Sequence, residues 1–166
     1  MSTEGLTFLA DGEESQADFA DAAAILEIVA LAAGPIPAGV AVPPYDGLDL
    51  ELTSYAWAGI TVTANNDGSG SSISITSSQS DRTIIVTESG IGVGSSRADA
   101  VTAGAFEEWD RDGDGVADLL GLDAVDVPGT ESLVRPGTVG RQFVLLLMEG
   151  DVVVSMQVPG NDFADI

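Results

Sequence analysis

The sequence contains no cysteine, no histidine and no lysine. Without cysteine or histidine there is no disulfide, no His-ligated zinc, and no Ser-His or Cys-His catalytic pair. Without lysine there is no Schiff-base chemistry and no Ser-Lys dyad. A carboxylate pair of the glycosidase kind remains possible, but no acid stands in an apolar setting except Glu27, which suits a helix edge or an arginine partner better. We therefore expect a protein that is not an enzyme.

Positive charge is also scarce. The 27 Asp and Glu residues give a formal net charge of −22 against five arginines. The basic residues are Arg82, Arg97, Arg111, Arg135 and Arg141. Nucleic acid binding requires clustered basic side chains that displace counterions, and an anionic membrane surface attracts the same clusters. We expect neither nucleic acid nor a membrane among the partners.

Such a charge indicates the medium in which the chain folds. In dilute buffer a net charge of −22 opposes compaction by self-repulsion. At molar salt the screening length falls to roughly 3 Å and the same surface is tolerated. A lysine-free, Asp-rich composition therefore favours a protein from an extreme halophile. A GC-rich genome would enrich Asp, Ala, Gly, Val and Arg without any salt, and this alternative stays open.

Long hydrophobic runs are missing as well. The run Ala22–Ala33 is too short to span a bilayer, and Glu27 interrupts it. The first residues, Met1 to Glu4, lack the positive charge that opens a secretory signal. We expect no membrane insertion and synthesis in the cytoplasm without a signal peptide.

The first 47 residues predict a helix and an arm. Ser15 and Asp18 resemble a capping box, apolar residues then recur at helical spacing from Phe19, and Gly34-Pro35 ends the helix. The helix is apolar nearly all round, which indicates burial against its own body or against another subunit. Residues 34–47 hold four of the seven prolines and predict an extended connector. We assign 1–47 to this helix and Pro-rich arm.

Residues 48–166 predict a β-rich body. Alternation of apolar and polar residues predicts strands at 48–52, 60–63, 72–76 and 82–87. Residues 142–148 and 152–158 predict a hairpin that is apolar on both faces in places, as expected for central strands. A helix over Ala98–Trp109 is expected to lead into an acidic loop inserted at about 98–126. The fold class is α+β and β-rich, with an antiparallel sheet or sandwich of about six or seven strands.

The acidic segment 110–118 has the pattern of a calcium loop. Carboxylates at positions 1, 3 and 5 of a tight loop converge on one cation, and Gly115 at position 6 permits the sharp turn. Position 7 offers a backbone carbonyl, and position 9 offers a carboxylate directly or through water. The predicted ligands are Asp110, Asp112, Asp114, Val116 and Asp118.

These residues resemble the EF-hand family over about 102–120. Phe106 and Trp109 stand where an incoming EF-hand helix carries its packing aromatics. An EF-hand has a bidentate Glu at position 12, whereas this chain has Gly121. The segment is therefore more similar to the shortened Asp-rich loops of dockerins and thrombospondin-type repeats. The resemblance implies a weak, structural Ca²⁺ site; the alternative is a solvated Asp-rich loop of a halophilic chain.

Together these features favour a structural subunit of a larger assembly, with copies of itself and other subunits as partners. In a salt-adapted setting, small β-rich subunits without a signal favour a virus particle, as a capsid, turret or tail component. The localisation we expect is a virion or another extracellular assembly. The alternatives are a cell-surface calcium-binding or adhesion module and, less favoured, a carboxylate-based hydrolase.

Overall fold

The computed structural model describes residues 1–48, 50–80 and 83–163, and arranges them in two helices and twelve strands. The helices are α1 (Ala22–Ala33) and α2 (Arg97–Thr102). The strands are β1 (Gly5–Ala10), β2 (Glu13–Asp18), β3 (Val40–Ala41), β4 (Leu52–Trp57), β5 (Ile60–Asn65), β6 (Ser71–Ile75), β7 (Gln79–Ser80), β8 (Thr83–Ile84), β9 (Phe106–Trp109), β10 (Leu119–Glu131), β11 (Val139–Glu149) and β12 (Val152–Asn161).

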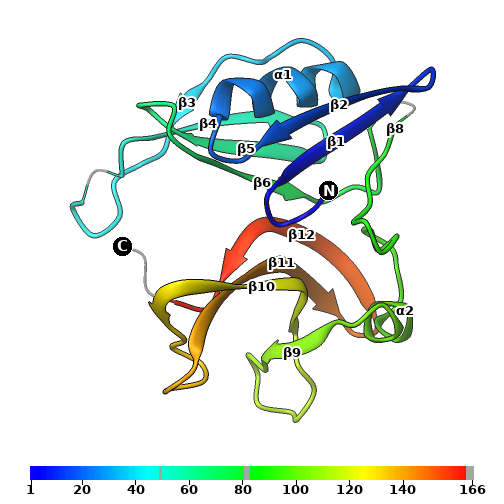
Figure 1. The fold of residues 1–166 in the computed structure, drawn as a ribbon, viewed down its shortest axis with the longest axis vertical. Helices are drawn as coiled ribbons and strands as arrows, with labels where there is room; N and C mark the ends of the chain where they lie inside the picture. The colour runs from blue at the N-terminus through cyan, green and yellow to red at the C-terminus, as the bar shows by residue number, and fades with distance from the viewer. Residues whose placement is uncertain (49, 81–82, 164–166) are drawn as a thin grey trace.

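Eight of the strands form one open antiparallel sheet in the order β3-β4-β5-β6-β12-β11-β10-β9. The pairs β1-β2 and β7-β8 form two small antiparallel sheets of their own. The expectation of a β-rich fold with an antiparallel sheet is confirmed, and the main sheet has more strands than the six or seven expected. Only three residue pairs join β6 to β12, and around this junction the sheet bends into an upper and a lower part (Figure 1).

The core lies on the inner faces of both parts of the sheet. Alternate residues of β5 are buried, namely Ile60, Val62 and Ala64, because successive side chains of a strand point to opposite faces. On the central strands β11 and β12, Leu146 and Met156 are fully buried. Removing each such side chain from water contributes roughly 1.5–3 kcal/mol. The expected hairpin over residues 142–158 is confirmed as these two strands.

The start of the first helix differs from the expectation. Ser15 lies in β2, and the cap is Asp21, whose carboxylate accepts a hydrogen bond from the Ala24 N–H at 3.0 Å. Residues 5–18 form a hairpin in which Leu6 and Phe8 point toward the core. The Ser15 prediction was wrong because Ser15 pairs with Phe8 in this hairpin, and strand pairing is stronger than an isolated capping signal.

α1 covers the upper part of the sheet with one face only (Figure 1). Ile25, Ile28 and Val29 are buried on β5 and β6, whereas Leu31 on the outer face is exposed. This part of the chain therefore folds onto its own body. Among the residues described, no helix is both long enough and apolar enough to cross a membrane.

The second helix is much shorter than expected. α2 ends at Thr102, and the residues predicted as its last turns form β9, which pairs with β10. In β9 the side chains alternate between partly buried and exposed, so the segment has the period of a strand. The acidic loop is consequently entered from a strand and not from a helix.

Two predicted strands are also shifted. The strand expected at 48–52 begins only at Leu52, and Asp49 lies outside the described residues. Of the strand expected at 82–87, Thr83–Ile84 form β8, and Arg82 lies outside the described residues. The strands expected at 60–63 and 72–76 are confirmed as β5 and β6.

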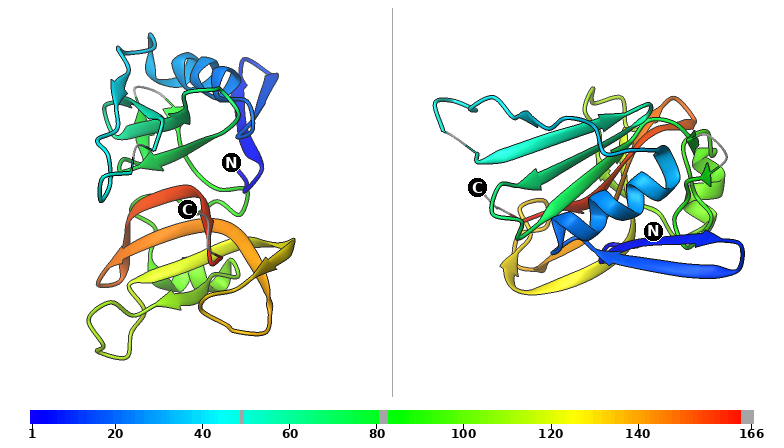
Figure 2. Two further views of the ribbon diagram at one scale, coloured as in Figure 1. Left: turned by 90° about the vertical axis from the view of Figure 1, so that its left-hand side faces the viewer. Right: turned by 90° about the horizontal axis from the view of Figure 1, so that it is seen from above.

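The Pro-rich arm is fixed at its base and free at its tip. The indole N–H of Trp57 donates to the carbonyl oxygens of Gly34 and Pro35, each at 3.1 Å. Further along, β3 pairs with β4 at the edge of the sheet. The remaining residues, 43–48, run out from the body on the side opposite the β1-β2 hairpin (Figure 2).

Candidate metal centre

The acidic loop joins the antiparallel strands β9 and β10 at the far end of the lower part of the sheet (Figure 1). Two hydrogen bonds to backbone carbonyl oxygens hold the C-terminal end of the loop. The carbonyl oxygen of Ala117 accepts a hydrogen bond from the Arg97 guanidinium at 2.8 Å, and that of Asp118 accepts from the Met148 N–H at 2.8 Å. The loop is thus anchored to α2 on one side and to β11 on the other.

Three of the predicted ligands come together. Carboxylate oxygens of Asp110, Asp112 and Asp118 lie within 4.8 Å of one another. Two oxygens bound to one calcium ion at about 2.3–2.6 Å each are at most about 5.2 Å apart. The three carboxylates therefore already lie within the span that a single Ca²⁺ requires, and hard oxygen donors are the ligands that this ion prefers.

Hydrogen bonds within the loop fix the carboxylate of Asp110. Its two oxygens accept from the N–H groups of Gly113 at 2.7 Å and Gly115 at 2.8 Å. The bond from Gly115 and then the bond from Gly113 lower the pKa of Asp110, because they stabilise the charged form. Gly115 has φ +89°, a conformation that glycine adopts without steric cost, as the loop pattern predicted.

The other predicted ligands are placed differently. Asp114 is not one of the three carboxylates that lie within 4.8 Å, and its Oδ1 accepts from the Val116 N–H at 2.8 Å. Asp118 Oδ2 accepts from the Arg111 N–H at 2.8 Å, which draws the end of the loop back over its start. Ligation by Asp114 and by the Val116 carbonyl stays a prediction.

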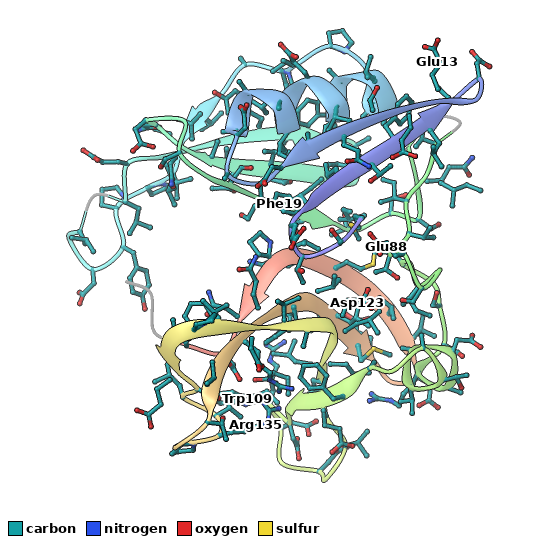
Figure 3. The ribbon with its side chains drawn as sticks, viewed as in Figure 1. Glu13, Phe19, Glu88, Trp109, Asp123 and Arg135 are labelled. Atoms are coloured by element: carbon teal, nitrogen blue, oxygen red, sulfur yellow. The ribbon has the colours of Figure 1, made fainter. Side chains whose placement is uncertain are left out.

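The elements around the loop are not those of an EF-hand helix pair. Phe106 lies in β9 and packs edge-on against Phe143, with ring centroids 5.6 Å apart, whereas Trp109 is mostly exposed (Figure 3). Gly121 lies in β10 opposite Phe106, and a Cβ there would stand 2.2 Å from the Phe106 ring. Gly121 stands where an EF-hand has its twelfth-position carboxylate. Its missing side chain leaves space for the Phe106 ring in the sheet.

A buried ionic cluster next to this loop was missed by the sequence reasoning. The carboxylate of Asp162 is fully buried and accepts from the Ser132 hydroxyl at 2.8 Å and from the Arg135 guanidinium at 3.0 Å. Arg135 also pairs with Glu108 at 2.8 Å, and the Arg141 guanidinium carbon lies 4.2 Å from the centre of the Phe106 ring. The cluster ties the end of β12 to β9 and β11.

Burial by itself raises the pKa of Asp162. The hydrogen bonds from the Arg141 N–H and the Ser132 hydroxyl lower it, as do the charges of Arg141 and Arg135, and together they prevail. The pKa of this carboxyl is therefore lowered. One sequence signal pointed to such a cluster: in a chain with five cations among 27 acids, each arginine is expected to form a specific ion pair.

A second pair of acidic residues, Glu88 and Asp123, lies between the two parts of the sheet (Figure 3), and the charge of one acts on the other. Burial, and next the charge of Glu88, raise the pKa of Asp123, while the Met1 ammonium acts in the opposite direction. That ammonium donates to the Val86 carbonyl at 3.1 Å. These groups hold the N-terminal segment between the two parts of the sheet.

No family model, no curated protein and no solved structure matches the chain. Function is therefore argued from the residues and their geometry.

Proposed function

We propose that this chain is a non-enzymatic structural subunit of a larger assembly built from copies of itself and other subunits. Large apolar side chains that stand exposed on a strongly charged surface carry this proposal. Leu9, Val40, Tyr45 and Ile84 are all at least 66% exposed. Leu9 and Ile84 line one groove, and Val40 and Tyr45 lie on the Pro-rich arm. Exposed apolar patches of this kind are typical of interaction surfaces.

The residue inventory supports the same proposal. The sequence contains no His, Cys or Lys, so it lacks the commonest general base and the cysteine and lysine nucleophiles. The buried carboxylates Glu108 and Asp162 are paired with arginines, a structural arrangement and not an acid–base pair.

The composition supports a salty setting for this assembly. Copies that each carry a charge of −22 repel one another in dilute buffer. Molar salt reduces the range of that repulsion to roughly 3 Å, which leaves the apolar contacts free to act. The specific form of the proposal is a virion component, in a capsid, turret or tail, of a virus of an extreme halophile.

A calcium ion bound by Asp110, Asp112 and Asp118 is the structural clamp in this proposal. The three carboxylates lie within 4.8 Å of one another, and like charges at this separation repel. A divalent cation would neutralise the cluster and fix the crossover from β9 to β10. The absence of a twelfth-position carboxylate at Gly121 suits a weak site that fills at high calcium concentration.

Size-exclusion chromatography with light scattering in molar salt, with and without a chelator, tests the proposal. We expect the mass to rise with protein concentration in the presence of calcium. A monomer whose mass is indifferent to concentration and to the chelator would contradict the assembly proposal. A concentration-independent monomer that requires calcium for its fold would favour the alternative of a surface-adhesion module.

A further inference from the structure

An apolar groove of about 990 Å³ opens on the upper part of the molecule, on the side of the β1-β2 hairpin. Its floor is formed by Ile60, Ile73 and Ile75 of β5 and β6, and α1 closes it from above. β1 forms one wall and residues 83–88 form the other. The groove is at the upper end of the size range of small-ligand pockets, so it is larger than one side chain needs.

The lips of the groove are apolar and exposed. Leu9 on the β1 wall is 70% exposed, and Ile84 on the opposite wall is 73% exposed. β1 pairs only with β2 in its two-stranded sheet, so its second edge faces the groove without a partner strand among the described residues. An exposed strand edge beside an apolar trough is a site at which another chain can pack.

The tip of the Pro-rich arm is a tight turn with two exposed apolar side chains. Tyr45 and Leu48 exchange two backbone hydrogen bonds, at 3.0 and 2.9 Å, and so close a tight turn. Asp46 and Gly47 at its apex have φ of +50° and +80°, the two positive values of a type I′ turn. Directly opposite residues in such a turn share one face, so Tyr45 and Leu48 stand side by side, 74% and 54% exposed.

The arm tip and the groove lie on opposite sides of the molecule. In Figures 1 and 2 the arm tip extends on the side away from the hairpin, whose strand β1 walls the groove. The tip therefore cannot occupy the groove of its own chain without leaving β4, to which β3 is paired. When two different surfaces on opposite sides of a subunit bind each other, each copy contacts the next one head to tail, and the contacts extend into a ring or a filament.

We propose that the Tyr45–Leu48 turn of one copy docks into the groove between β1 and residues 83–88 of the next copy. This inference rests on the proposed function as a self-assembling subunit and names the contact that links the subunits. The tip is pre-organised by its hydrogen bonds, so little conformational freedom is lost on docking. A tyrosine that enters an apolar pocket is a frequent centre of interface energy.

The charges around the groove determine how this contact depends on salt. Asp11, Glu14 and Glu88 line the groove, whereas the arm from Gly34 to Tyr45 carries no charge. Asp46 is the one acid on the arm tip and adds a repulsion with these groups. Molar salt screens that repulsion, so the contact should strengthen as the salt concentration rises.

Two single substitutions separate the two halves of the contact. Leu9→Asp disables the groove and leaves the arm intact, whereas Tyr45→Asp disables the arm and leaves the groove intact. We expect each to weaken self-association by about tenfold or more, measured by sedimentation velocity in molar salt. Mixed in equal amounts, the two variants should form a 1:1 pair and nothing longer, because one intact arm then meets one intact groove.

Three further variants control for charge. Leu133→Asp adds the same charge at a residue that is 67% exposed and lies in the connection between β10 and β11, and it should associate as the wild type does. Leu9→Asn and Tyr45→Ser remove the apolar contact without adding charge and should weaken association as the Asp variants do. Asp46→Asn should strengthen association at low salt.

The outcomes separate this inference from the proposed function. If the wild type associates and Leu9→Asp and Tyr45→Asp associate equally well, or if their mixture forms no pair, the docking contact is wrong and the assembly proposal stands. If the wild type stays monomeric in molar salt, both are wrong. Nile red, a neutral apolar dye, should bind monomeric Tyr45→Asp and be excluded from wild-type oligomers; equal binding to both would show that the arm does not fill the groove.

Discussion

Asp162 joins several segments of the lower part of the sheet. Its buried carboxylate is hydrogen-bonded to Ser132 and Arg135 and accepts from the Arg141 N–H at 2.6 Å. Of the four arginines in the described ranges, Arg135 and Arg141 contact this carboxylate, and Arg97 lies 3.4 Å from the exposed Asp151. The Asp162 cluster thus joins the end of β12 to β11 and to the connection between β10 and β11.

Asp162→Asn should destabilise the protein by about 2–3 kcal/mol at neutral pH. The change leaves two arginines without their shared carboxylate, and the cost stays below that of a fully buried pair because both guanidinium groups are partly exposed. Chemical denaturation in molar salt measures the free energy of unfolding. Asp11→Asn is a matched control on the exposed hairpin turn and should change it little.

The effect of Asp162→Asn should also depend on pH. The folded protein lowers the pKa of Asp162 below its ordinary value of 3.8, so ionised Asp162 stabilises the fold. That contribution is complete above the ordinary pKa and is lost as the pH falls through the lowered one. The difference between wild type and variant should therefore be largest at neutral pH and shrink below about pH 4. A difference that stays constant down to pH 2 would contradict this role.

Local chemistry at single residues was predictable from the sequence where the pattern is contiguous. The positive φ of Gly115 and the convergence of Asp110, Asp112 and Asp118 follow from spacing within nine residues. The Asp162 cluster was not predictable in this way. It joins side chains from β9, β11 and the end of β12. A periodic pattern describes neighbouring residues only, so it cannot predict a contact between residues so far apart in the chain.

At the scale of elements, the sequence predicted the strands with a clear apolar pattern and missed β1, β2 and β9. β5 and β6 were found because their apolar residues recur with period two, and the β11-β12 hairpin because its runs are apolar on both faces. Phe106–Trp109 has only four residues, and the helix-favouring stretch before it was extended too far. Residues 106–109 are extended because they pair with β10. Local sequence propensity contains no information about such a pairing partner.

Gly121→Ala should separate β9 from β10. The added Cβ would stand 2.2 Å from the Phe106 ring, which cannot retreat because Arg141 covers one side and Phe143 packs against its edge. Overpacking of this kind costs about 1–3 kcal/mol of stability, measurable by thermal or chemical unfolding.

The double variant Gly121→Ala/Phe106→Leu provides the control for this clash. The smaller leucine side chain frees the space, so the two changes together should cost less than the sum of their separate effects. Additive costs would show that Gly121 is required for another reason.

Calcium should protect the acidic loop and its flanks before any other region. We expect one ion per chain, and removal of the ion by a chelator should accelerate hydrogen exchange first within residues 100–125. Asp112→Asn should abolish the calcium-dependent protection, whereas Asp67→Asn, in the turn between β5 and β6, should leave it unchanged. Exchange in residues 100–125 that does not respond to calcium would contradict the clamp.

At the scale of the whole molecule, the division into an upper and a lower part could not be read from the sequence. The groove combines β1, α1, the β5-β6 pair and residues 83–88, four segments that lie far apart in the sequence. What composition did predict is the type of surface, because 27 acids and five cations leave most of it negatively charged. Exposed apolar side chains on such a surface are the feature that assembly explains.

The central claim is that copies of this chain associate with one another in salt. Sedimentation velocity of the wild-type protein over a wide range of concentrations, in molar salt with calcium and in dilute buffer, tests it most directly. We predict species larger than the monomer that grow with concentration in molar salt and dissociate in dilute buffer. A single monomeric boundary at every concentration in molar salt would contradict the claim.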